Sequence, residues 1–231
     1  QPYKSLTGSQ TIADSKKAFH TAFPYVIPSL YRRTADELLV ELHLLSHQTN
    51  FRINALFAVG LCQVYQAFTK GYRPEDQLEP MFSALCSCNG FDGDEIRALA
   101  QGSTKAVKGH TVEDVQSWLK SKGKGAPEPL AAGLKAVTGD DFHYSRLVAV
   151  GLFSLLSEAQ GKESADPEEL SKTVHAIGEQ IGLSRPRLEK DLGLYRSNLE
   201  KMAQAVELME ETLAAERRKR ERQQAEKASK D

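Results

Sequence analysis

Few residues in this chain can form covalent cross-links, and no stretch is apolar enough to cross a membrane. Its three cysteines, Cys62, Cys86 and Cys88, are an odd number without C-x-x-C spacing. This argues against a disulfide framework and fits a reducing compartment. The longest apolar runs, residues 55–62 and 147–153, fall far short of the roughly 18–20 residues of a membrane-spanning helix. We therefore expect a soluble or peripheral protein that is not secreted.

An excess of charge of either sign is also missing. The 30 basic and 31 acidic residues nearly cancel, so the whole molecule has no strong field to attract nucleic acid or an anionic membrane. With 40% hydrophobic and 26% charged residues, the chain can bury a core. Its 231 residues suit one large domain, or one domain with an extended appendage. Because it begins at Gln1, we expect that an initiator residue or a targeting segment is missing.

The common catalytic and nucleotide-binding motifs are absent. There is no G-x-S-x-G elbow, Walker A loop or G-x-G-x-x-G turn. His43 and His47 are spaced for one helix face, but Leu44 stands where the zinc-protease motif H-E-x-x-H needs a glutamate. Cys86 and Cys88 would point to different faces of a helix, with no further ligands nearby. We expect no enzymatic activity, no cofactor and no metal site.

Almost every apolar pattern has the period of a helix rather than that of a strand. One such stripe consists of Tyr31, Ala35, Leu38, Leu39, Leu42 and Leu45. Helix starts are marked by side chains that can accept hydrogen bonds from backbone N–H groups: Thr11 with Asp14, Asp92 with Glu95, Thr111 with Asp114, and Asp166 before Pro167. The sequence predicts an all-α protein of about nine or ten helices, with a bundle-like globular body over residues 1–183.

Glycine and proline interrupt the middle of this body. Between residues 101 and 139 the chain is broken by Gly102, Gly109, Gly123, Gly125, Pro127 and Pro129. We expect a loose connector over about residues 101–139. Two short helices within it should still dock on the core through Leu119, Leu130, Leu134 and Val137.

Two segments of the chain resemble each other. At an offset of 91, LFAVGL (residues 56–61) matches LVAVGL (residues 147–152), and an offset of 92 continues the match to Ile96 and Leu188. Gly60 and Gly151 lie inside these apolar stretches, where a glycine costs roughly 1 kcal/mol relative to alanine. A close helix crossing would explain that cost. Two related helical units are one interpretation, and chance similarity between amphipathic helices is the other.

The last segment, residues 184–231, has the most regular pattern in the chain. Apolar residues recur at spacings of four and three: Leu188, Leu192, Tyr195, Leu199, Met202, Val206, Met209 and Leu213. A helix over residues 184–227 would be roughly 65 Å long, so its far end must project. We expect the part from Leu188 to Met202 to pack on the body of a monomer, and the part beyond Leu213 to stand in solvent. A homodimeric coiled-coil scaffold is the alternative.

A basic segment, Arg217, Arg218, Lys219 and Arg220, lies near the end of this predicted helix. Neighbouring glutamates form i,i+4 opposite-charge pairs with basic residues, which is typical of a solvated helix. Contact with a partner or a membrane surface is a second interpretation, and nucleic-acid binding a third. A further candidate site is Tyr144, Ser145 and Arg146, just before an apolar helix. We expect Ser145 to cap that helix and Arg146 to join a buried or partner-facing ion pair.

Several motifs together resemble the thylakoid formation family of cyanobacteria and chloroplasts. They are IADSKKAF (residues 12–19), ELLVELHLL (residues 37–45), FHYSRLVAVGLF (residues 142–153) and DLGLYRSNLEKM (residues 191–202). Residues 101–139 depart from the family pattern in their content of glycine, lysine and proline. The resemblance implies a non-enzymatic factor in thylakoid biogenesis and photosystem II repair, acting through FtsH-type membrane proteases. It also implies a location in the chloroplast, in the stroma and associated with the thylakoid, or alternatively in the cytoplasm and at the thylakoid of a cyanobacterium.

Overall fold

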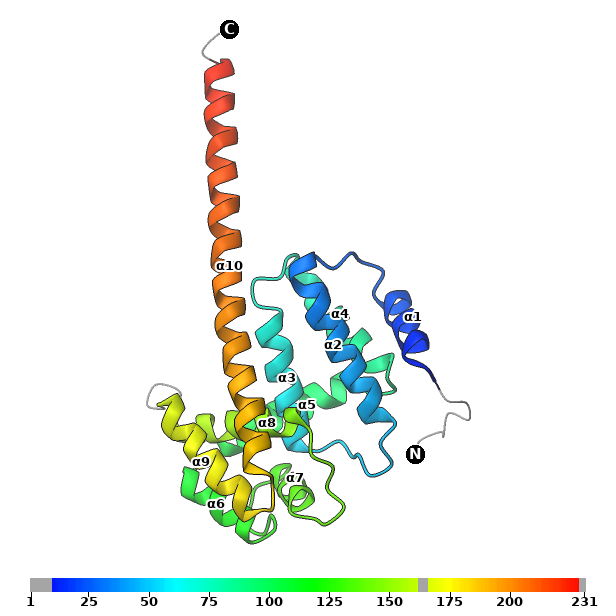
Figure 1. Ribbon diagram of the computed structural model, residues 1–231, viewed down its shortest axis with the longest axis vertical. Coiled ribbons are helices and arrows are strands. Elements are labelled where there is room, and N and C mark those ends of the chain that lie inside the picture. The colour runs from blue at the N-terminus through cyan, green and yellow to red at the C-terminus, as the bar shows by residue number, and fades with distance from the viewer. Residues whose placement is uncertain (1–9, 162–165, 229–231) are drawn as a thin grey trace.

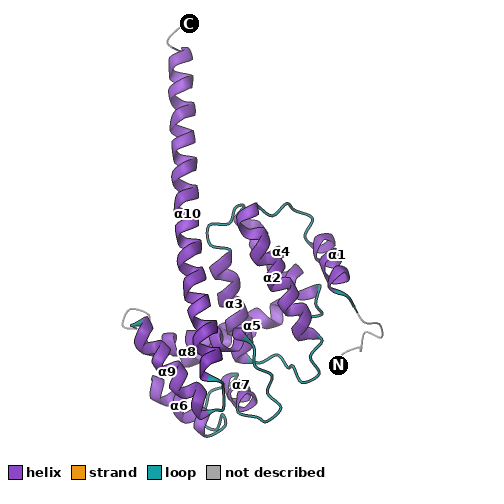
Figure 2. Cartoon of the chain, in the orientation of Figure 1, coloured by secondary structure: helices purple, strands orange, loops and turns teal. Residues whose placement is uncertain are grey.

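The computed structural model describes residues 10–161 and 166–228, and every regular element in these ranges is helical. The helices form a globular body from which the last one projects (Figure 1, Figure 2). In chain order they are α1 (Ile12–Ala22), α2 (Ser29–Ser46), α3 (Ala55–Phe68), the 3-10 helix η1 (Glu75–Gln77), α4 (Leu78–Ser87), α5 (Gly93–Val107), α6 (Val112–Lys120), α7 (Leu130–Val137), α8 (Arg146–Gln160), α9 (Pro167–Gln180) and α10 (Arg185–Ala228). The predicted all-α class and long C-terminal helix are confirmed.

The predicted helix starts hold N-caps. Each capping side chain accepts a hydrogen bond from a backbone N–H in the first turn of its helix: Thr11 in α1, Asp92 in α5, Thr111 in α6 and Asp166 in α9. Such caps satisfy N–H groups that the helix itself leaves free, and each contributes about 1 kcal/mol. Local sequence therefore determines where these helices begin.

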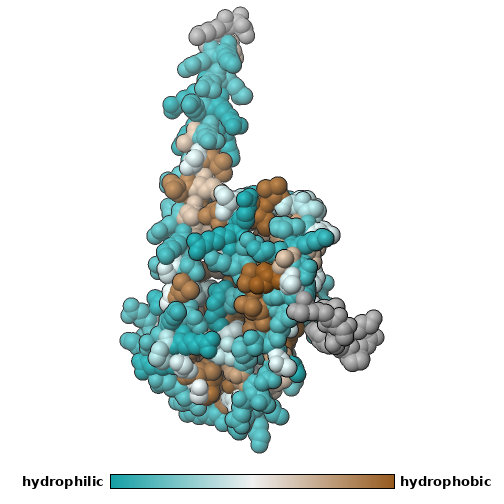
Figure 3. Space-filling model, turned by 45° about the vertical axis from the view of Figure 1, so that its right-hand side comes forward, coloured by the Kyte–Doolittle hydropathy of each residue, from teal (hydrophilic) through white to brown (hydrophobic). Residues whose placement is uncertain are grey.

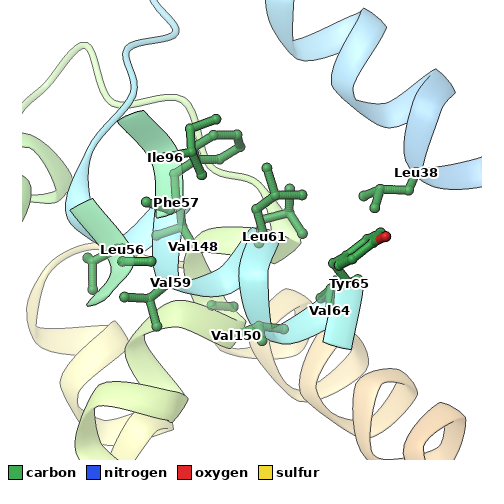
Figure 4. Packing of buried hydrophobic residues seen from close by; sticks show 14 of the residues in the cluster. Leu38, Leu56, Phe57, Val59, Leu61, Val64, Tyr65, Ile96, Val148 and Val150 are labelled. Atoms are coloured by element: carbon green, nitrogen blue, oxygen red, sulfur yellow. The ribbon is translucent and has the colours of Figure 1, made fainter. Parts of the chain in front are cut away.

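The helices α3 and α8 cross at the centre of the body, and most residues of both are buried. Figure 4 shows side chains of this core, among them Leu61 of α3 and Val150 of α8. Gly60 and Gly151 lie at the crossing, where each backbone leaves no room for a Cβ on the other helix. The prediction that these glycines serve a close helix crossing is confirmed.

The two halves of the body repeat one arrangement, with α3, α4 and α5 matched in order by α8, α9 and α10. The turns after α4 and α9 agree in detail. Gly90 and Gly182 both have a φ of 80°, which ends each helix in a left-handed turn. Phe91 and Leu183 then donate their N–H groups to carbonyls five residues earlier, at 3.0 and 2.8 Å. This geometry supports two related helical units over chance similarity.

The stretch 101–139 contains two short helices, α6 and α7, which dock on the body as predicted. Their buried residues include Trp118, Leu119, Leu130, Leu134 and Val137. The stretch has less connector than the sequence predicts, because α5 continues without a break through Gly102 to Val107. Gly109, Gly123 and Gly125 have positive φ values in the turns between helices, where glycine is favoured.

The helix α10 packs on the body over its first half and then projects (Figure 1). Its 44 residues give it a length of about 66 Å. Packing extends slightly farther than predicted, to Val206, which is 6% exposed and lies against Gly71. Leu199, expected inside the packed part, is instead 36% exposed. The heptad spacing alone does not decide this, because Leu192 and Val206 share the heptad position of Leu199 and are both buried against the body, whereas Leu199 faces solvent between them.

Candidate partner-binding surface

The residues Tyr144, Ser145 and Arg146 lie where α8 begins, close to α2 and α10. Ser145 is the N-cap of α8, and its Oγ accepts a hydrogen bond from the N–H of Leu147 at 3.2 Å. The capping role predicted from the sequence is therefore present. It fixes the direction in which the two neighbouring side chains leave the helix.

Arg146 forms an ion pair with Glu41, a residue of α2. Its Nε donates to Glu41 Oε1 and Oε2 at 3.0 and 2.9 Å, and its Nη2 donates to Oε2 at 2.6 Å. Such charge-assisted, forked geometry is among the stronger side-chain interactions. The two side chains are 27% and 22% exposed. The predicted ion pair is thus formed within the chain, and it is half-buried.

Tyr144 connects the start of α8 to α10. Its hydroxyl donates to Asp191 Oδ2 at 2.7 Å, and the guanidinium carbon of Arg187 lies 4.6 Å from the centre of its ring. Burial, together with the hydrogen bond to Asp191, raises the pKa of Tyr144 above its usual value. The phenol is therefore a stable neutral donor at physiological pH. These contacts hold α10 at a fixed angle to the body.

A groove of about 750 Å³ runs between α2 and α10, with the end of α3 as its floor. Figure 1 shows α3 between these two helices. Val64 and Phe68 of α3 lie at the bottom, and Leu194 and Met202 of α10 line one wall. This is the size of cleft in which proteins usually bind ligands or side chains of partners.

Charged side chains line the rim of the groove. The pair Arg146–Glu41 belongs to its lining, and Arg33 and Glu37 of α2 form a second pair, with Nε and Oε1 2.8 Å apart. Lys201 of α10 faces the same groove. The site therefore combines an apolar floor with a polar rim, which is the usual composition of a protein-binding surface.

Sequence reasoning identified Arg146 but missed the groove, because its apolar residues on α2, α3 and α10 all have helical spacing and were assigned to packing. In the sequence, Leu194 is the residue that could have indicated the groove. It is apolar, lies outside the regular seam of α10, and is 48% exposed.

The basic segment Arg217, Arg218, Lys219 and Arg220 is exposed on the projecting part of α10, away from the groove. Leu208 and Leu213 lie between it and the body, and they are 65% and 51% exposed. Figure 3 shows this change along α10, from hydrophobic residues near the body to hydrophilic ones toward the end. The residues at the start of α8 and the basic segment of α10 therefore belong to two separate surfaces.

The three cysteines and His43, which the sequence raised as candidates, are packed in or against the core, whereas His47 is exposed. Burial raises the pKa of the Cys62 and Cys88 thiols to about 11 and that of Cys86 to about 12, so their reactive thiolate forms are suppressed. The Nδ1 atom of His43 lies 2.8 Å from Ser15 Oγ. Over residues 10–161 and 166–228, no group of three or more potential ligands is placed to hold a metal ion.

Across the same described ranges, none of the helices has the length and apolar character needed to cross a bilayer.

Comparison with known proteins identifies the family. The family described as thylakoid formation protein matches residues 11–224, nearly the whole chain. The chain belongs to the thylakoid formation protein family. It is 58% identical to protein Thf1 of Prochlorococcus marinus (strain MIT 9313) over 96% of this chain and 92% of that protein. It is 51% identical to protein Thf1 of Synechococcus sp. (strain CC9605), over 96% of this chain and 98% of the other.

A solved structure, that of Psb29 at 1.55 Å, has the same fold. It matches with a TM-score of 0.77 and 35% sequence identity, over 91% of this chain and 98% of Psb29. In this member of the family, two of the motifs that carry the resemblance, residues 142–153 and 191–202, meet in space. The hydrogen bond between Tyr144 and Asp191 joins them. The family motif therefore marks the attachment of α10 to the body.

Proposed function

We propose that this protein is a non-enzymatic accessory factor in thylakoid biogenesis and photosystem II repair, acting through FtsH-type membrane proteases. The observation that carries the proposal is the family match over residues 11–224, which includes both the body and the projecting helix. The similarity to Psb29 supports a link with photosystem II. The polar residues at the start of α8 support a structural role, since their contacts connect helices to one another.

The proposed location is the cytoplasmic side of the thylakoid membrane of a cyanobacterium. Relatives with high identity come from Prochlorococcus and Synechococcus, which favours this alternative over the chloroplast stroma. Contact with the membrane would be peripheral. The basic segment at the end of α10 is suited to anionic lipid headgroups, because each Lys or Arg near such a surface contributes about 1 kcal/mol.

The shape of the molecule suggests how it would work with a protease. The body offers a groove with a polar rim, and α10 extends well beyond it, so that a partner bound to the body could be contacted at a second point. Two weak contacts on one rigid molecule give a tighter complex than either alone. No chemical step by the accessory factor is required.

The test is purification of a tagged full-length copy from solubilised thylakoid membranes. We expect an FtsH-type protease to be recovered, and we expect a strain lacking the protein to lose this protease or its activity on damaged photosystem II. A tagged unrelated helical protein is the control for non-specific capture. Normal protease level and photosystem II turnover in the deletion strain, with no protease on the tagged copy, would contradict the proposal.

A further inference from the structure

The two related halves of the body correspond in α2 and α7 as well. Glu41 of α2 contacts Arg146 at the start of α8. The position 92 residues after Glu41 is Gly133 of α7, and the position 91 residues before Arg146 is Ala55 at the start of α3. These two are also in contact, since a Cβ on Gly133 would lie 3.0 Å from the Cβ of Ala55. The helices α2 and α7 therefore make corresponding contacts in the two halves, with α7 packed more closely on α3 than α2 is on α8.

In the second half, the place that corresponds to the groove is filled. A Cβ on Gly102 of α5 would lie 3.7 Å from Pro129, just before α7, so the two walls meet there. One buried residue of α6, a helix that packs against α7 and α8, is Trp118. Its ring centre lies 4.8 Å from that of His110, and it lies next to Gly125. A short helix with an aromatic side chain therefore closes this half.

In the first half, the equivalent positions line an open groove. Shifted by 92 positions, these four residues become groove residues: Leu194 for Gly102, Glu37 for Pro129, Met202 for His110 and Arg33 for Gly125. At the position of Trp118 the first half has Val26, which lies in the loop between α1 and α2 and is 83% exposed. Within the part of the chain that the structure describes, no helix takes the place of α6 here.

We infer that the groove is a docking site for a short amphipathic helix of a partner protein, inserted where the second half holds α6. The helix α6 shows the pattern that fits. Its buried residues Val115, Trp118 and Leu119 lie at positions i, i+3 and i+4, on one face of the helix. Helices bind grooves through anchors at this spacing, and a large aromatic anchor supplies much of the binding free energy.

Charge on the rim adds a second requirement for the partner helix. Arg33 pairs with Glu37 and Arg146 with Glu41, so these charges largely compensate each other. Lys201 has no carboxylate within ion-pair distance among the described residues that line the groove. An aspartate or glutamate on the partner, flanking the apolar anchors, would pair with Lys201. The partner helix is therefore apolar on one face and acidic beside it.

This inference rests on the proposed function only in taking the occupant to be part of a partner protein. Binding of a model helix to the groove can be measured without the protease. Recovery of the protease from membranes can likewise be measured without reference to the groove. The two proposals can therefore fail separately.

The experiment uses the full chain and a fluorescent, hydrocarbon-stapled peptide of about 16 residues, long enough for about four helical turns. The peptide has Val, Trp and Leu spaced as in α6, with glutamates beside them. A second peptide has lysines in place of the glutamates, and a third has serines in place of Trp and Leu. Fluorescence anisotropy measures binding, and we expect saturable binding of the first peptide and much weaker binding of the other two.

Variants of exposed groove residues locate the site. Lys201→Glu should weaken binding of the acidic peptide by about tenfold or more and strengthen binding of the lysine peptide, because the charge pair is reversed. Leu194→Lys should weaken binding of both peptides. The matched controls are Lys227→Glu and Leu213→Lys, which lie on α10 beyond the groove and should bind as the wild type does. Circular dichroism confirms that each variant is folded.

The results that overturn the inference are equally specific. Equal binding by the wild type and Leu194→Lys, or no discrimination between acidic and lysine peptides, would place the peptide elsewhere. Absence of binding would exclude an amphipathic helix as the occupant. A dimer in light scattering that Leu194→Lys dissociates would assign the groove to a second copy of the chain. Recovery of the protease with wild type and Leu194→Lys alike would leave the proposed function standing without the groove.

Discussion

Gly60 of α3 and Gly151 of α8 make the same contact with each other's helix. A Cβ on Gly60 would lie 1.7 Å from the carbonyl oxygen of Leu147, and a Cβ on Gly151 would lie 1.9 Å from that of Leu56. Leu56 and Leu147 are themselves 91 positions apart, as are the two glycines. The crossing is therefore nearly symmetric, and the fold is built from two similar units that meet at their glycines.

Replacing either glycine by alanine should be strongly destabilising. In both cases the atoms in the way are backbone atoms of the facing helix, which can yield only if the helices move apart. We expect Gly60→Ala or Gly151→Ala to lower the free energy of unfolding by about 3 kcal/mol, at the upper end of overpacking costs. Urea denaturation followed by circular dichroism measures this. The control is Gly193→Ala in α10, where a Cβ meets nothing within 4 Å and alanine should stabilise the helix by about 1 kcal/mol. Unchanged stability of Gly60→Ala would mean that the crossing is looser than described.

The ion pair at the start of α8 should contribute more to stability than an exposed pair does. Arg146→Ala leaves Glu41 half-buried without its partner, and we expect a loss of about 2 kcal/mol. Arg146→Lys should restore part of it, since lysine keeps the charge but not the forked geometry. The matched control is Arg33→Ala, because the pair Arg33–Glu37 is exposed and should contribute at most about 0.5 kcal/mol. Equal effects of the two alanine variants in thermal or urea unfolding would contradict this ranking.

Sequence patterns predicted those parts of the fold that depend on neighbouring residues. Helix starts followed from capping side chains such as Thr11 and Asp92, because a cap acts within one turn. The prediction that Leu199 packs on the body was wrong, because its exposure depends on how a straight helix lies against the body rather than on the spacing of apolar residues. The groove was missed for the same reason. Whether the apolar face around Leu194 is covered depends on the distance between α2 and α10, and no local pattern encodes that distance.

The thiols should make the protein less stable at high pH. Burial raises the pKa of Cys62 and Cys88 from 9.0 to about 11 and that of Cys86 from 9.0 to about 12. The folded state therefore binds more protons than the unfolded state above pH 9, and its stability falls as the pH rises through this window. We expect little change in melting temperature between pH 7 and 8 and a clear decrease by pH 10.

At pH 8, a disulfide reagent should label the thiols slowly in the folded protein and quickly in urea. Rapid labelling of the folded protein would show that the cysteines are accessible.

The stretch 101–139 should exchange its amide hydrogens faster than the central helices do. The helices α6 and α7 are short, with nine and eight residues, whereas α3 and α8 have 14 and 15 residues and are buried against each other. Local opening of a short helix at the edge of a fold breaks fewer contacts and needs less free energy. Hydrogen exchange followed by mass spectrometry tests this, with the peptides of α3 and α8 as internal reference. Equal protection of all four helices would show that residues 101–139 belong fully to the cooperative core.

The protein should be a monomer whose stability does not depend on the end of α10. The contacts of α10 with the body end near Val206, and residues 214–228 are exposed. Truncation after Ala214 should therefore leave the melting temperature within a few degrees, because none of the described residues that it removes is buried. Leu192→Asp should unfold or loosen the body, since Leu192 is 2% exposed, whereas Leu199→Asp should have a small effect at its exposed position.

The full chain and the truncated chain should both have a monomer mass in light scattering. A dimer mass for the full chain that becomes a monomer mass after truncation would show that the exposed Leu208 and Leu213 belong to a coiled coil between two copies.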